Sequence, residues 1–105
     1  MAFDAKLEII NGVAKISLSG ELDAATSPLL KEKVEEAAKQ KVRRLVLLAQ
    51  DLKYMASAGL RVLIFSKQKM GTDVDIYVVG AQKLILETLD KTGFAKSVII
   101  VNEYP

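Results

Sequence analysis

The chain of 105 residues contains no cysteine, no histidine and no tryptophan, and only two prolines. Without cysteine it forms neither a disulfide nor a thiolate metal site. Without histidine it lacks both the base of a Ser-His-Asp triad and the commonest zinc ligand. These absences exclude most nucleophilic hydrolases and most transition-metal sites, and we expect no cofactor and no metal.

The sequence also has no large excess of basic or of acidic residues. Fifteen basic and thirteen acidic side chains leave a formal net charge of +2, which argues against a nucleic-acid partner. No apolar run reaches the roughly 20 residues that a membrane-spanning helix needs, and no signal-peptide segment follows Met1. We therefore expect a cytoplasmic protein with no membrane insertion, folded as one domain over residues 1–105. Its oligomeric state does not follow from the sequence.

The amino-terminal pattern predicts a β-hairpin. Apolar and polar residues alternate over residues 3–9 and again over 14–19, as in half-buried strands. Asn11-Gly12 between them is a strong signal for a type I′ turn, and Gly20 is expected to end the second strand.

Three helix–strand units follow the hairpin. Ser27-Pro28 is typical of a cap followed by the first helical residue. Short apolar runs predict strands buried on both faces, and helical spacing predicts the intervening helices. The strands are expected at residues 45–49, 76–79 and 98–101, and the helices after residues 27, 57 and 83. The expected fold class is α/β, a small mixed sheet with helices packed on it.

Two predicted loops, residues 19–26 and 54–60, follow strands of this sheet. Functional groups of open α/β sheets gather beyond the carboxyl ends of the strands. In the second loop, Ser57 is either a helix cap or a modified serine at a helix N-terminus, where a phosphate is favoured. In the first, Asp23 is either an acceptor for backbone N–H groups of its loop or part of a polar contact surface. A hydrolase is a weak alternative, because Met55 to Gly59 is one glycine short of the G-x-S-x-G elbow and no histidine activates the serine.

Two segments resemble the STAS domain of bacterial anti-sigma factor antagonists. They are G-E-L-D-A-A-T at residues 20–26 and D-L-K-Y-M-A-S-A-G-L-R-V-L at residues 51–63. The second segment, S-x-G-L followed by an apolar helix, is the more specific one. The similarity in order and spacing continues to Thr92-Gly93-Phe94.

The resemblance implies a non-enzymatic protein that acts by partner switching. Members of this family bind an anti-sigma factor that is also a serine kinase, which releases the sigma factor for transcription. The kinase phosphorylates the serine two places before the motif glycine, Ser57 here, and a serine phosphatase restores it. The implied partner-binding residues are Glu21, Leu22, Asp23, Ala56, Ser57, Ala58, Gly59, Leu60 and Arg61.

The sequence departs from the family at two positions beside the implied phosphosite. Ala56 stands where aspartate is common, and Leu48 stands where many members have aspartate or asparagine. The chain also resembles small STAS proteins that are accessory subunits of ATP-driven transporters. Those subunits need no phosphorylation. That role is the alternative interpretation.

Overall fold

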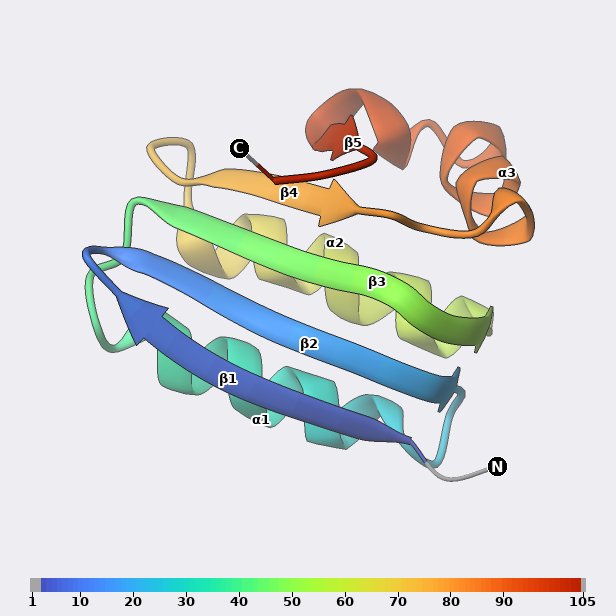
Figure 1. Ribbon diagram of the computed structural model, residues 1–105, viewed down its shortest axis with the longest axis horizontal. Coiled ribbons are helices and arrows are strands. Elements are labelled where there is room, and N and C mark those ends of the chain that lie inside the picture. The colour runs from blue at the N-terminus through green and yellow to red at the C-terminus, as the bar shows by residue number, and fades with distance from the viewer. Residues whose placement is uncertain (1–2, 105) are drawn as a thin grey trace.

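The computed structural model describes residues 3–104, in which a β-sheet of five strands carries three α-helices (Figure 1). In chain order the elements are β1 (Asp4–Ile10), β2 (Val13–Leu22), α1 (Ser27–Ala38), β3 (Arg44–Met55), α2 (Ser57–Met70), β4 (Asp75–Val79), α3 (Lys83–Lys91), the 3-10 helix η1 (Phe94–Ser97) and β5 (Ile99–Val101). The predicted class, a hairpin followed by three helix–strand units, is confirmed.

The strands lie in the sheet in the order of the chain, from β1 to β5. β1 and β2 are antiparallel, and the three later pairings are parallel. The hairpin turns at Asn11 and Gly12, whose φ angles of 53° and 77° are both positive, as a type I′ turn requires. The sheet is therefore mixed, as expected.

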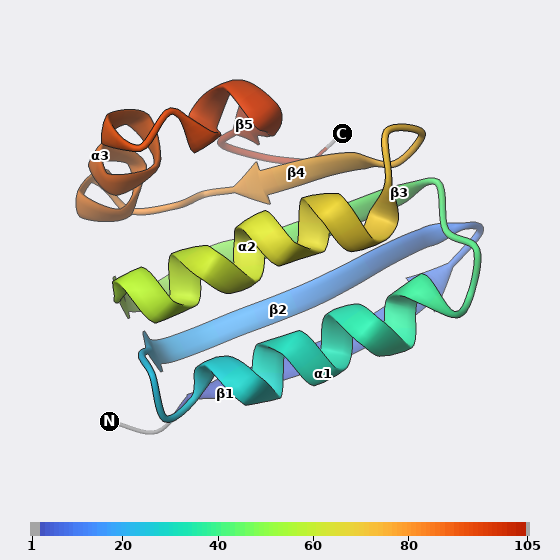
Figure 2. The same ribbon diagram turned by 180° about the vertical axis from the view of Figure 1, so that it is seen from behind.

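The hydrophobic core lies between one face of the sheet and the helices. α1 and α2 run side by side across that face, and α3 lies toward the β4–β5 side of the sheet (Figures 1 and 2). Ile16 of β2, Leu47 of β3 and Leu30 of α1 are at most 1% exposed. The position of Ile16 follows from the period-2 alternation of its strand, Leu47 belongs to a continuous apolar run, and Leu30 follows from helical spacing.

Within residues 3–104 no helix lies on the opposite face, yet Val46 at its centre is fully buried (Figure 1). Val46 lies between Lys15 and Tyr77 in the sheet register. The Tyr104 ring packs edge to face on Tyr77 with centroids 5.1 Å apart, and the Lys15 ammonium lies 5.2 Å from the Tyr104 centroid. Arg44 Nη1 donates to the Tyr104 hydroxyl at 3.0 Å. Aromatic rings therefore take the place of a helix layer over the middle of β3.

Two strands extend further than the sequence pattern predicts. β2 continues through Gly20 to Leu22, and β3 continues to Met55 through residues that the pattern assigns to a loop. The register between them shifts after Ser17 and again after Gly20, which marks β-bulges. Bulges interrupt the alternation of apolar and polar residues, so the pattern hides the end of each strand.

Candidate functional site

The two predicted functional loops meet at the carboxyl ends of β2 and β3. Leu22 and Met55 are register partners, and the Ala56 N–H donates to the Leu22 carbonyl at 2.8 Å. α2 starts directly above Leu22, because a Cβ atom on Gly59 would lie only 2.7 Å from Leu22 Cγ. A glycine at position 59 therefore lets the helix approach β2 and holds the two motifs together.

Ser57 is the first residue of α2 and is exposed to solvent. The N-cap position belongs to Ala56, which is extended at φ −81° and ψ 171° and makes no side-chain cap hydrogen bond. Within residues 3–104 the Ser57 hydroxyl makes no hydrogen bond, so its interpretation as a helix cap is wrong. The first turn of α2 also carries no acidic side chain. An added phosphate would give this first turn its own anionic group, which the helix dipole favours.

Asp23 organises the loop that enters α1. Its Oδ1 accepts the backbone N–H groups of Ala25 and Thr26, both at 3.0 Å. Thr26, not Ser27, occupies the N-cap position of α1, and the Ser27 hydroxyl instead donates to the Asp23 carbonyl at 2.5 Å. The helix therefore begins with Ser27, and Pro28 is its second residue. The prediction of Asp23 as a loop acceptor agrees with this geometry.

These hydrogen bonds make the stability of the loop depend on pH. The backbone N–H of Thr26, and then its hydroxyl, lower the pKa of Asp23 from its ordinary value of 3.8. A lowered folded-state pKa stabilises the fold above pH 3.8, and this contribution is lost as the pH falls through the lowered value. Asp23→Asn keeps an acceptor oxygen but does not ionise. We expect wild type to melt at a higher temperature than Asp23→Asn at neutral pH, and the gap to close well below pH 3.8. A constant gap in melting temperature across that range would contradict this account.

The nine residues implied as partner contacts divide between core and surface. Leu22, Gly59 and Leu60 are buried, and Leu22 has no exposed area, so these three offer little or no side-chain surface to a partner. Their role is to pack α2 against β2, which holds the two loops in place. The other six are at least partly exposed: Glu21, Asp23, Ala56, Ser57, Ala58 and Arg61.

Two apolar side chains at the same end of the molecule were not singled out by the sequence. Tyr54, the register partner of Glu21, is 46% exposed, and Leu29 in the first turn of α1 is 48% exposed. Met55, the next residue after Tyr54, is buried. At the end of β3 burial recurs at every third residue, at Ala49, Leu52 and Met55, so no alternation in the sequence marked Tyr54 as exposed.

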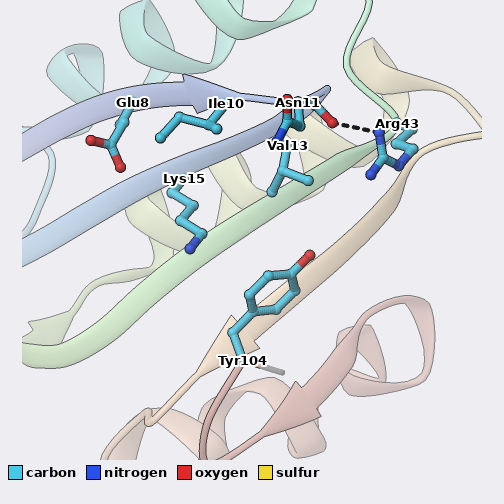
Figure 3. Close-up of a pocket in the computed structure, with 7 residues that line it drawn as sticks. All are labelled: Glu8, Ile10, Asn11, Val13, Lys15, Arg43 and Tyr104. Carbon is cyan, nitrogen blue, oxygen red and sulfur yellow. Dashed lines mark hydrogen bonds between the residues drawn. The ribbon is translucent and has the colours of Figure 1, made fainter.

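A separate hollow of about 260 Å³ lies at the opposite end of β2 and β3, on the sheet face without helices (Figure 3). Arg43 donates to the Asn11 carbonyl there, and Lys15 extends toward Tyr104. The hollow shares no residue with the two functional loops.

Within residues 3–104 no cluster of three acidic side chains suits a metal ion. Of the helices in this range, none has the length and apolar character to cross a membrane.

Comparison with known proteins gives a family match over almost the whole chain. The model of the STAS domain family matches residues 4–104. Among curated proteins, the anti-sigma-F factor antagonist RsfB of Mycobacterium tuberculosis is 29% identical over 87 residues, which cover 83% of this chain and 71% of RsfB.

Solved structures show the same fold. An anti-sigma factor antagonist from Mycobacterium paratuberculosis has a TM-score of 0.88 at 24% identity, covering 97% of this chain and 87% of that one. SpoIIAA in its unphosphorylated form has a TM-score of 0.81 at 17% identity, covering 95% and 90%. The Bacillus protein SpoIIAA in its phosphorylated form has a TM-score of 0.72 at 17% identity, covering 97% and 93%.

Proposed function

This chain belongs to the STAS domain family, and we propose that it acts as an anti-sigma factor antagonist by partner switching. The partner is an anti-sigma factor with serine kinase activity, bound in the cytoplasm, and the antagonist itself catalyses no reaction. The observation that carries the proposal is Ser57, an exposed serine with an uncommitted hydroxyl beside the loop of Asp23. The names of RsfB and SpoIIAA support the antagonist role, and the phosphorylated form of SpoIIAA supports a phosphate switch.

The docking surface consists of the partly or fully exposed residues around the carboxyl ends of β2 and β3. Tyr54 and Leu29 supply exposed apolar area. Ala56 and Ala58 are small, and they leave room for a kinase to approach Ser57 closely. Such an approach requires an accessible hydroxyl, which the first turn of α2 provides.

The switch step is a phosphoryl transfer from ATP. The bond between the Ser57 Oγ and the γ-phosphorus forms while the bond from that phosphorus to the β-phosphate oxygen breaks. ADP leaves, and the hydroxyl proton passes to a base of the kinase. The product carries a charge of about −1.5 to −2 at neutral pH. Placed among apolar and small residues of a docking surface, this charge opposes binding through desolvation. A serine phosphatase hydrolyses the ester and restores the hydroxyl.

Phosphate incorporation tests the proposal directly. After incubation with the anti-sigma kinase and ATP, mass spectrometry should find one phosphate on wild type and none on Ser57→Ala. Ser57→Ala should still bind the kinase, because it removes only the acceptor oxygen. Ser97→Ala is the matched control, since Ser97 is an exposed serine in η1, remote from the motif in sequence. Phosphate on Ser57→Ala, or none on wild type bound to an active kinase, would refute the switch.

The accessory role in an ATP-driven transporter is the second candidate. It is favoured by Ala56, which presents no carboxylate beside Ser57. Binding to a transporter ATPase, with no phosphate on Ser57 and no kinase partner, would select this role over the antagonist.

A further inference from the structure

Ser57 and Arg61 lie one helical turn apart on the outward side of α2. Exposed residues of this helix recur as a stripe of Ser57, Arg61, Ile64 and Gln68, while Leu60 and Leu63 face the core. Residues four apart on a helix are neighbours, with Cβ atoms about 5–6 Å from each other. A group attached to the Ser57 oxygen extends into the space that the Arg61 side chain can reach.

Arg61 has no competing anion in the described part of the chain. No ion pair or side-chain hydrogen bond between residues 3 and 104 involves it. It borders a hollow of about 220 Å³ between α1 and α2, together with Lys31, Val62 and Phe65. None of these lining side chains is acidic. The Lys31 ammonium lies 4.9 Å from the Phe65 centroid, so it is already engaged with a ring. The guanidinium of Arg61, one turn from Ser57 on the same helix, is thus an available cation.

We propose that Arg61 binds the phosphate carried by Ser57 within the same helix. This inference rests on the proposed phosphorylation of Ser57 and adds the residue that receives its charge. The planar guanidinium presents paired N–H donors that match two phosphate oxygens. The order of the pair, with the anion nearer the helix N-terminus and the cation four residues later, is also the favourable one.

Capture of the phosphate changes the docking surface in two ways at once. The phosphate adds negative charge at Ser57, and it also withdraws the Arg61 guanidinium from any carboxylate of the kinase. Release of the kinase then depends on two changes: the Arg61 guanidinium no longer donates to the kinase, and the phosphate adds negative charge. Arg61 is in this sense a positioning residue of the switch.

Phosphorus NMR on chemically defined protein tests the pair. Phosphoserine is installed at position 57 by semisynthesis, so that no kinase is needed, and the second pKa of the phosphate is followed by ³¹P chemical shift. An unperturbed phosphoserine titrates near pH 6. A bound guanidinium favours the dianion and lowers that pKa, so Arg61→Gln should raise it by about 0.2–0.4 unit. Arg61→Lys should restore part of the shift, because ammonium is a point charge without the paired donors.

Two matched controls separate Arg61 from the general field of the protein. Lys69→Gln removes the same charge from the same helix, but its Cα lies about 18 Å along the axis from Ser57, against about 6 Å for Arg61. That separation exceeds the Debye length of about 8 Å at physiological salt, so no shift is expected. Lys31→Gln removes the other cation of the hollow and should shift the pKa less than Arg61→Gln. The remaining charged groups at this end, Lys53, Glu21 and Asp23, stay constant in all variants.

The outcomes are decisive in both directions. Equal phosphate pKa values in wild type and Arg61→Gln, or equal shifts from Lys31→Gln and Arg61→Gln, would overturn the proposal. Amide spectra of each variant establish that the fold is unchanged. Because the phosphate is installed chemically, failure here leaves the kinase assay unaffected, and failure of the kinase assay does not alter this titration.

Discussion

Replacing Ser57 by aspartate is expected to weaken binding to the anti-sigma kinase at least about tenfold, which corresponds to about 1.4 kcal/mol. Aspartate places a negative charge where the docking surface has small and apolar neighbours, and that charge loses water when the partner covers it. The Ser57 hydroxyl makes no hydrogen bond inside residues 3–104 and the residue is exposed, so the fold itself should tolerate the change. Calorimetric titration of the kinase measures the affinity, and thermal unfolding checks the fold.

Ser57→Asn is the matched control for the aspartate variant. Its side chain has nearly the same size and shape but no charge, so its affinity should stay within about threefold of wild type. Equal loss in both variants would assign the effect to size, and unchanged affinity of Ser57→Asp would remove the phosphate switch from this protein. A variant that binds weakly and also unfolds at lower temperature would instead point to damage at the start of α2.

Leu22→Ala is expected to destabilise the protein by about 2–5 kcal/mol, the usual cost of truncating a buried leucine. Leu22 has no exposed area and lies against Gly59 at the start of α2. Removing its branched end leaves a cavity under both functional loops. The loss is a large part of the about 5–15 kcal/mol that stabilises a domain of ordinary size. Urea unfolding followed by circular dichroism measures the change in the free energy of unfolding.

Leu84→Ala is the control for this experiment, because Leu84 is 64% exposed on α3. The same chemical change there should alter stability by less than about 0.5 kcal/mol. If Leu22→Ala unfolds like wild type and yet loses kinase binding, Leu22 belongs to the docking surface and not to the core.

The order and type of the elements were predictable because they depend on local patterns. Asn11-Gly12 predicted the hairpin, and its positive φ angles confirm the turn. Gly93 follows the end of α3 with a left-handed φ of 79°, and Phe94 after it is buried. The resemblance to the STAS domain is confirmed by the match of that family over residues 4–104.

The ends of β2 and β3 and the two helix starts were predicted wrongly. Residues 50–55 contain three charged or polar side chains, so they are typical of a loop, but pairing with β2 keeps them in the sheet. Ser27, predicted as a cap, and Ser57, for which a cap was one of two alternatives, are each the first helical residue instead. Residue type alone suggests that a serine is a cap. The residue at which the helix actually begins depends on where the preceding strand ends.

The sequence by itself determined the family, the α/β class and the two motifs that carry the site, because these depend on residue order and short-range periodicity. Only the tertiary structure decided which residues of the motifs face solvent. Packing of α2 against β2 buries Leu22, Gly59 and Leu60, and the loop hydrogen bonds engage Asp23. The same packing turns Ser57 and Arg61 outward together. The cause is the contact between α2 and β2, which are separated in the chain by α1 and β3. No short-range sequence pattern specifies which residues meet in such a contact.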